Sequence, residues 1–357
     1  MSRNGVSTPP VVPIVVADEA ISCLDELFGA RTEIVRRPGA AIRREHLAGA
    51  RGLLVRSVTR VDASLLSGTS IEWVGSVTAG TDHVDVAWLD AHGIAFAHAP
   101  GANAEAVAQY VVAALLHLSI ERGLDLARST IGVIGRGHVG RRVLVHARRL
   151  GMRVLASDPP LERAGDPGPF VPLEDLLAWS NVVTLHVPLV RGGPDPTVDL
   201  LDGARLAAMR SGAFLVNSCR GGVVDEVALT RVLDSGRLGG AVLDVFAGEP
   251  SVDEALVRRA DLATPHIAGY TVEAKTAVTL AVYRAFAPRF GWPDRAFGEL
   301  LERPVTGLVR LPPPDATAAL AATGLPAVSA ELRANPREFA RIRKDYVFRR
   351  EIFEPAG

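Results

Sequence analysis

Two series of short β-branched runs, each run followed by a longer helical pattern, dominate the sequence. The first series gives candidate strands at Val11 to Val16, Gly52 to Arg56, Trp73 to Thr78 and Gly93 to His98. The second gives candidate strands at Ile131 to Gly135, Arg153 to Ser157, Val182 to Val187, Ala213 to Ser218 and Ala241 to Val245. Strands that alternate with helices form parallel sheets, because each helix returns the chain to the same edge. We therefore predict an α/β protein with two doubly wound parallel sheets.

The composition limits the classes of partner and compartment. The chain has 357 residues, 48% of them hydrophobic, which suffices for two domains and an appendage. Its 39 Lys and Arg residues balance 40 Asp and Glu residues, so charge gives no support for a nucleic-acid or membrane partner. Cys23 and Cys219 lack the spacing of a disulfide framework or a metal site, which is typical of a cytoplasmic protein without zinc.

Two further segments bear on localisation. Met1 to Pro10 is polar and has no apolar core of signal-peptide length, so we expect a loose extension. Val107 to Ile120 is apolar but too short to span a bilayer, and it carries Gln109 and His117. We predict that it is a buried helix between domains or subunits.

A glycine motif, Gly135-Arg136-Gly137-His138-Val139-Gly140, lies directly after an apolar strand and before a helical pattern. Glycines at this spacing allow a tight turn, and the helix N-terminus presents N–H groups to a pyrophosphate. Asp158 ends the next strand, where a carboxylate accepts hydrogen bonds from the adenosine ribose and repels a 2′-phosphate. The motif therefore favours NAD over NADP. The alternative is a glycine-rich turn without a ligand, in which Asp158 caps a helix before Pro159.

Three residues that follow later strands predict hydride-transfer chemistry on a hydroxy acid. Arg220 follows one strand, where a guanidinium can bind a carboxylate through paired donors; the alternative is a surface pair with Asp225 or Glu226. Glu249 follows the next strand, and His266 lies 17 residues further on. A carboxylate facing the imidazole would hold its tautomer and favour its protonated form. His266 therefore qualifies as the acid/base, although a lone loop histidine is usually structural.

These motifs together resemble the D-isomer-specific 2-hydroxyacid dehydrogenases, over residues 50 to 285. Four segments are similar to the branch of that family that oxidises 4-phosphoerythronate with NAD in vitamin B6 biosynthesis: Arg56 to Thr59, Thr78 to Asp85, Asn217 to Asp225 and His266 to Thr271. The resemblance implies that His266 accepts the proton of the 2-hydroxyl group, Arg220 orients the substrate and Glu249 tunes His266.

The resemblance also implies binding residues. Substrate contacts are expected at Arg56, Ser57, Thr78 and Tyr270. Cofactor contacts are expected at Gly135, Gly137, His138, Val139, Gly140, Asp158, Val187, Ser218, Cys219, Arg220, Asp244 and Gly269. For Asp244, a helix N-cap is the rival interpretation. No metal is expected.

In the family, a substrate-binding domain is interrupted by the nucleotide-binding domain, and both have Rossmann-like or flavodoxin-like folds. We accordingly expect a substrate-binding domain at 1–103 and 266–290, an NAD-binding Rossmann domain at 104–265, and a small α+β dimerisation region at 291–357. Phe339 to Tyr346 and Arg349 to Glu351 resemble the family's dimerisation region, and the family forms homodimers. Arg349 or Arg350 is a hypothetical ligand of the substrate phosphate; the alternative is a solvated basic helix face.

Two other functions fit the same residues. One is a different D-2-hydroxyacid dehydrogenase, acting on 3-phosphoglycerate, glyoxylate or hydroxypyruvate with the same catalytic residues. The other is a non-catalytic NAD(H)-sensing protein with this fold. A different D-2-hydroxyacid dehydrogenase would differ from an enzyme that oxidises 4-phosphoerythronate only in the residues of its substrate pocket.

Overall fold

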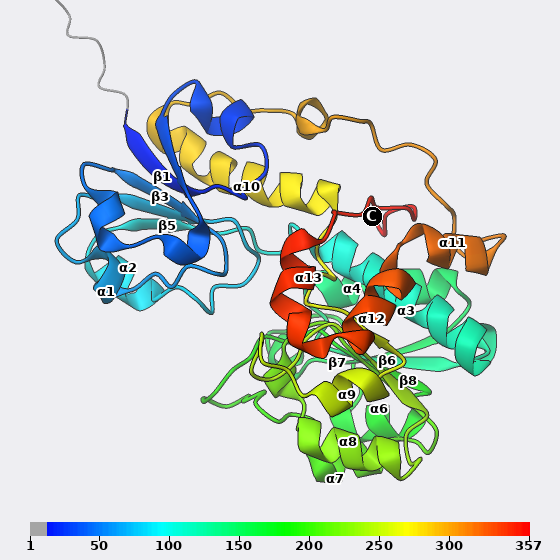
Figure 1. Cartoon of the computed structure of the whole chain (residues 1–357). Helices are drawn as coiled ribbons and strands as arrows, with labels where there is room; N and C mark the ends of the chain where they lie inside the picture. The colour runs from blue at the N-terminus through cyan, green and yellow to red at the C-terminus, as the bar shows by residue number, and fades with distance from the viewer. Residues whose placement is uncertain (1–12) are drawn as a thin grey trace, which may run out of the picture. The chain divides into compact units, whose positions relative to one another are not determined.

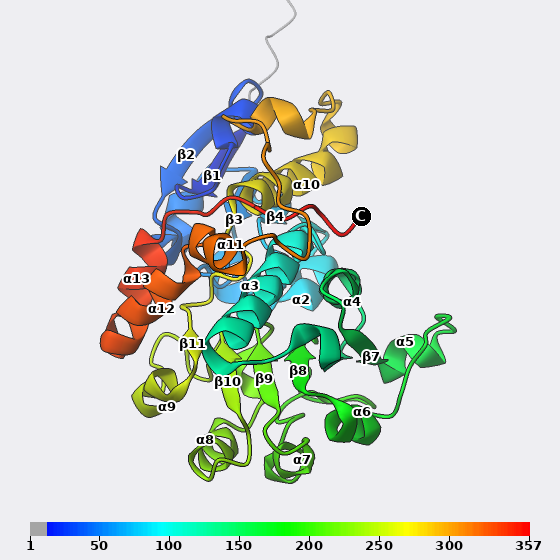
Figure 2. The ribbon, with the colours of Figure 1, turned by 90° about the vertical axis from the view of Figure 1, so that its right-hand side faces the viewer.

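A computed structural model describes residues 13–357, which divide into two compact units (Figures 1 and 2). Unit 1 consists of the chain up to Ala102 together with Lys275–Pro304. Unit 2 consists of Asn103–Ala274 and Val305–Gly357. Met1 to Pro10, and the start of the strand predicted at Val11, lie outside the described residues.

Unit 1 contains a parallel sheet of five strands in the order β2-β1-β3-β4-β5. The strands are β1 (Ile14–Asp18), β2 (Glu33–Arg37), β3 (Gly52–Val55), β4 (Trp73–Ser76) and β5 (Ala95–Ala97). One face packs against α10 (Val272–Phe290), and the other against α1 (Ala63–Leu66) and α2 (Val86–Ala91) (Figure 1). Because both faces are covered, β3 and β4 are buried along their whole length. The four predicted strands are confirmed.

Unit 2 contains a parallel sheet of six strands in the order β11-β10-β9-β8-β6-β7. The strands are β6 (Thr130–Ile134), β7 (Arg153–Ser157), β8 (Val182–Leu185), β9 (Phe214–Asn217), β10 (Gly240–Leu243) and β11 (Leu262–Ala263). The first five match the predicted strands. The chain order reverses at β6, which pairs with β7 on one side and β8 on the other. Ligands of open α/β sheets bind beyond the carboxyl ends of the strands at such a point.

Helices cover both faces of this sheet (Figure 2). On one side lie α3 (Ala104–Arg122) and α4 (His138–Arg149), with α11 (Ala316–Ala322) packed on α3. On the other lie α6 (Leu173–Trp179), α7 (Gly203–Ala208) and α8 (Glu226–Asp234). Helix α12 (Leu325–Ala334) packs on β11 and contacts α9 (Glu254–Arg259) and α13 (Phe339–Asp345), while α5 (Pro159–Arg163) follows β7. The two sheets and their helices confirm the predicted α/β fold class.

The apolar helix α3 belongs to the core of unit 2. By length and composition it could cross a membrane, but 72% of its most apolar stretch is buried inside the protein, as in the core helix of a globular protein. Leu311, Leu320 and Phe353 of the C-terminal segment belong to the same hydrophobic cluster. The chain's own C-terminal segment thus covers part of the helix surface that the sequence led us to expect at an interface.

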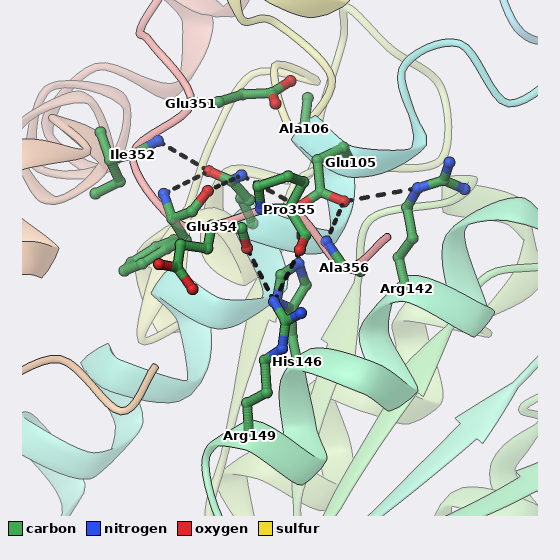
Figure 3. A network of polar contacts seen from close by, with 12 residues as sticks. Glu105, Ala106, Arg142, His146, Arg149, Glu351, Ile352, Glu354, Pro355 and Ala356 are labelled. Carbon is green, nitrogen blue, oxygen red and sulfur yellow. Dashed lines mark hydrogen bonds and ion pairs between the residues drawn. The ribbon is translucent and has the colours of Figure 1, made fainter. Parts of the chain in front are cut away.

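Polar contacts fasten the end of the chain to α3 and α4 (Figure 3). The Gln109 side chain accepts a hydrogen bond from the Phe353 amide (3.2 Å) and donates one to the Phe353 carbonyl (2.9 Å). Glu105 accepts a hydrogen bond from the Ala356 amide (3.2 Å), and its other oxygen lies 2.7 Å from Nε2 of the buried His146. The tail is therefore an integral part of unit 2.

This arrangement differs from the predicted division into domains. The C-terminal segment, residues 305–357, packs with the nucleotide-binding sheet instead of forming a region of its own. The chain passes into unit 1 at Lys275, within α10, nine residues after the predicted boundary at His266. In this segment the described structure is helical, with isolated bridges from Phe353 to Val309 and from Arg349 to Thr271. Its role in dimerisation stays a prediction.

Candidate active site

The glycine motif forms the turn between β6 and α4. Gly135 has a φ of 89°, and a Cβ there would lie 2.5 Å from the carbonyl oxygen of His186. A Cβ at Gly140 would lie 2.0 Å from the carbonyl oxygen of Gly135, so this glycine permits the helix to approach the turn. A Cβ at Gly137, by contrast, would have no neighbouring atom within 4 Å among the described residues. The backbone of Gly137 therefore faces open space at the helix N-terminus.

Several observations show that a dinucleotide fits this turn. Helix α4 begins at the exposed His138 and has no side-chain cap, so its first N–H groups remain available to an anion. Val187, two residues after the end of β8, lies against Gly135 across the point where the strand order reverses. The buried Ser218 hydroxyl, after β9, has no hydrogen-bond partner among the described residues. The loops after β6, β8 and β9 thus carry predicted cofactor residues, and the contacts of these residues with NAD stay predictions.

Asp158 has one of the two roles that the sequence left open, that of a helix cap, and it also binds the glycine turn. One carboxylate oxygen accepts a hydrogen bond from the Arg136 amide in the glycine turn (2.7 Å). The other accepts one from the Leu161 amide (3.1 Å) and so caps α5. The carboxylate therefore ties the end of β7 to the glycine turn, and its contact with the ribose stays a prediction.

The Asn217 side chain shapes the turn that carries Arg220. Its amide donates a hydrogen bond to the Arg220 carbonyl (3.0 Å), and its oxygen accepts one from the Cys219 amide (3.2 Å). A Cβ at Gly221 would collide with the backbone of Phe246, so the turn packs closely against the next loop. Burial raises the pKa of the Cys219 thiol, which excludes a reactive thiolate at neutral pH.

His266 and Glu249 form a hydrogen-bonded pair. Nδ1 of His266 lies 2.8 Å from Oε2 of Glu249, and the other oxygen of Glu249 accepts a hydrogen bond from the Phe246 amide (2.9 Å). Burial disfavours the charged form of Glu249, but its hydrogen bonds and the charges of His266 and Arg343 outweigh burial and lower the pKa of Glu249. The imidazole remains one-third exposed. The imidazole can therefore accept a proton at Nε2, the ring nitrogen that does not contact Glu249.

The backbone of His266 is in the left-handed region, with a φ of 56°. A residue other than glycine in this region is strained and needs support from its surroundings. Asp244, wholly buried at the end of β10, supplies part of it by accepting hydrogen bonds from the amides of Ile267 (2.8 Å) and Ala268 (2.9 Å). Asp244 thus supports the loop of His266, and its contact with the cofactor stays a prediction.

Arg349 holds the same loop from the C-terminal segment. Its guanidinium donates hydrogen bonds to the carbonyls of Ala268 (2.7 Å), Ala106 (2.9 Å) and Ile267 (3.1 Å). Arg350 forms an ion pair with Glu273. These contacts give both arginines a structural role.

The predicted substrate residues of unit 1 follow adjacent strands. Arg56 and the exposed Ser57 follow β3, and Thr78 follows β4; the ends of these strands are paired. Arg56 forms two hydrogen bonds with the buried carboxylate of Asp18 (2.8 and 3.2 Å). The Thr78 hydroxyl donates to the Gly80 carbonyl (2.6 Å). The carboxyl edge of the sheet in unit 1 therefore presents all three residues.

Arg343 was not among the predicted site residues, although it lies in the family-like segment Phe339 to Tyr346. Its guanidinium donates a hydrogen bond to the Tyr270 hydroxyl (3.2 Å) and lies 4.0 Å from the carboxylate of Glu249. Because 94 positions separate Arg343 from Glu249, no local spacing could reveal this contact.

Comparisons with known proteins decide the family. A model of the D-isomer specific 2-hydroxyacid dehydrogenase NAD binding domain matches residues 103–268. The erythronate-4-phosphate dehydrogenase of Pectobacterium carotovorum is 44% identical over 301 residues, 84% of this chain and 80% of that protein. That of Escherichia coli is 40% identical over 346 residues, 94% of this chain and 92% of that protein. The chain belongs to the erythronate-4-phosphate dehydrogenase family.

The solved structures agree with this membership. The D-lactate dehydrogenase of Aquifex aeolicus, solved with NAD and lactic acid, has a TM-score of 0.65 and 25% identity, covering 78% of this chain and 96% of its own. Membership in the erythronate-4-phosphate dehydrogenase family confirms the predicted NAD-dependent oxidoreductase, and the matched domain confirms NAD as its cofactor.

Proposed function

We propose that this chain oxidises the 2-hydroxyl of 4-phospho-D-erythronate to give (R)-3-hydroxy-2-oxo-4-phosphobutanoate, in the biosynthesis of pyridoxal 5′-phosphate. Similarity to erythronate-4-phosphate dehydrogenases over most of the chain supports the substrate. The observation that carries the chemistry is the 2.8 Å contact between His266 and Glu249.

The two residues divide the proton chemistry between them. The carboxylate of Glu249 fixes a proton on Nδ1 of His266, which leaves Nε2 as the base. NAD, held at the glycine turn before α4, would supply the acceptor for the hydride that leaves C2. The proton of the 2-hydroxyl passes to Nε2 of His266, and the C–O bond becomes a carbonyl. Glu249 stabilises the imidazolium that forms, because a negative charge beside it compensates the new positive charge.

Arg220 has the complementary role in this proposal. Its guanidinium binds the substrate carboxylate, and its charge polarises the carbonyl as it forms. The turn closed by Asn217 presents it at the carboxyl edge of the sheet, one strand from Asp244. In unit 1, Arg56, Ser57 and Thr78 are proposed as further substrate residues.

We also infer a homodimer in the cytoplasm. Both cysteines are free, which suits a reducing compartment. The dimer rests on the family resemblance, and light scattering on the purified protein tests it. A monomer at micromolar concentration would contradict it.

The test of the proposed function is oxidation of 4-phosphoerythronate by the purified protein. The assay contains 2-oxoglutarate to reoxidise bound NADH, because a retained cofactor would hide turnover. 3-Phosphoglycerate and D-glycerate serve as controls. A strong preference for 4-phosphoerythronate is expected. Turnover of a control alone would assign another hydroxy acid to the site, and inactivity on all three would favour the NAD(H)-sensing protein.

A further inference from the structure

Arg343 projects from the short helix α13, red in Figure 1. Phe339 and Ile342 of this helix are buried in the hydrophobic core against the nucleotide-binding sheet, so the position of the helix is fixed by packing. The Arg343 side chain remains 23% exposed. Its guanidinium carbon lies 5.7 Å from the centre of the Tyr270 ring, and its Nη2 lies 3.2 Å from the Tyr270 hydroxyl.

Three arginines of the C-terminal segment, Arg343, Arg349 and Arg350, have different kinds of contact near the loop that carries His266. Arg349 donates to backbone carbonyls, and Arg350 is paired with Glu273. Arg343 contacts a neutral hydroxyl and a carboxylate at 4.0 Å, a distance at which an ion pair is weak. Among these three arginines, Arg343 is therefore the one whose N–H groups are best able to donate hydrogen bonds to an anionic ligand.

The position of Arg343 suits one part of the substrate in particular. The proposed function already uses Arg220 for the carboxylate and His266 for the hydroxyl. In a four-carbon acid the phosphate is only a few bonds from the hydroxyl carbon, so its binding group must lie near the catalytic pair. Arg343 lies 4.0 Å from Glu249 and beside Tyr270, which follows the catalytic loop. A phosphate dianion is best bound by charge-assisted donors and by a guanidinium above all.

We propose that Arg343, together with the Tyr270 hydroxyl, binds the phosphate of the substrate and sets the preference for phosphorylated hydroxy acids. This inference rests on the proposed function. It replaces Arg349 and Arg350 as the candidate phosphate ligands, because their observed contacts are structural. It also gives the C-terminal segment a part in substrate selection.

The experiment compares Arg343→Gln and Arg343→Lys with wild type, using 4-phospho-D-erythronate and unphosphorylated D-erythronate as paired substrates. The matched control is Arg341→Gln, on the same helix, where Arg341 is half-exposed and paired with Glu331 and Glu338. The readouts are kcat/KM for each substrate, NADH affinity, and inhibition of D-erythronate oxidation by inorganic phosphate.

For Arg343→Gln we expect kcat/KM for the phosphorylated substrate to fall by about 10- to 100-fold, the range for loss of a hydrogen bond to a charged group. Oxidation of D-erythronate and NADH affinity should stay within about threefold, since neither involves a phosphate on the substrate. Inhibition by inorganic phosphate should weaken in parallel. Arg343→Lys should retain part of the preference, and Arg341→Gln all of it.

An equal fall for both substrates would overturn the inference, because Arg343 would then act only on Glu249 or on the fold. An unchanged preference in Arg343→Gln would overturn it as well. If Arg343→Gln fails to fold, the same comparison on Arg343→Lys decides. Failure of the proposed function is distinguishable, because it appears as wild-type protein that does not oxidise 4-phosphoerythronate.

Discussion

Asp244 and Arg349 both bind Ile267 and Ala268, in the loop that carries His266, through opposite polar groups. The Asp244 carboxylate accepts hydrogen bonds from the amides of Ile267 and Ala268, and the Arg349 guanidinium donates to their carbonyls. These residues directly follow His266, whose φ is 56°. A buried anion and a cation from distant parts of unit 2 therefore maintain the strained backbone on which the proposed acid/base depends.

Replacement of Arg349 tests this support. Arg349→Met removes the donor to the carbonyl of the buried Ala268, while the Ile267 carbonyl keeps its hydrogen bond from the Tyr270 amide, so the free energy of unfolding should fall by roughly 1 to 3 kcal/mol. The value of kcat should fall by at least about tenfold, because His266 loses its fixed position. Chemical denaturation and steady-state kinetics measure the two effects. Arg310→Met, at an exposed arginine of the same unit, is the control. Equal stability and kcat in both variants would show that the loop holds its shape without Arg349.

The largely buried carboxyl group of Glu351 should make the stability of the protein depend on pH. Burial, together with the charges of Glu273 and Glu105, raises the pKa of Glu351 to about 7 from an ordinary value of 4.5. The folded state therefore favours the protonated carboxyl, so this contribution to stability is complete below about pH 4.5 and is lost as the pH rises through about 7. Glu351→Gln removes the carboxyl group whose ionisation destabilises the folded state. This variant should therefore be more stable than wild type by about 2 to 3 kcal/mol at about pH 8.

The gain from Glu351→Gln should shrink to below about 1 kcal/mol at about pH 5, where the wild-type carboxyl is already largely protonated. Thermal unfolding over this pH range is the measurement. Glu354→Gln, at an exposed carboxylate of the same tail, is the matched control. A constant difference between Glu351→Gln and wild type across the range would contradict the assignment.

The glycine turn gives a prediction about NAD binding. Gly137 has a negative φ and open space around it, so Gly137→Ala should fold with an unchanged melting temperature. The added methyl group should nevertheless raise the Kd for NADH by about tenfold or more, because this backbone is where a pyrophosphate approaches. Calorimetric titration measures the Kd. Gly140→Ala, whose methyl would meet the Gly135 carbonyl, should instead lower the melting temperature. Unchanged NADH affinity in Gly137→Ala would place the pyrophosphate elsewhere.

The buried strands were predictable because a parallel sheet covered on both faces has continuous apolar strands. Strand β2 was missed because it is an edge strand with Glu33, Arg36 and Arg37 at its ends, and β11 because it has only two residues. The glycine turn follows β6 directly and Glu249 lies in the loop after β10, so the order of the predicted strands revealed both, and His266 was identified 17 residues after Glu249. The contacts of Arg343 and Arg349 depend on how the C-terminal segment packs, which no local pattern contains.

The most direct test of the proposed mechanism is single-turnover formation of NADH, followed by the absorbance of the reduced nicotinamide, with excess enzyme and NAD mixed with 4-phosphoerythronate. Wild type is compared with His266→Asn and Glu249→Gln. We predict that His266→Asn forms NADH at least about 100-fold more slowly, the scale of a lost general base, and that Glu249→Gln lies between the two. NADH formation by His266→Asn at the wild-type rate would contradict the assignment of His266 as the base.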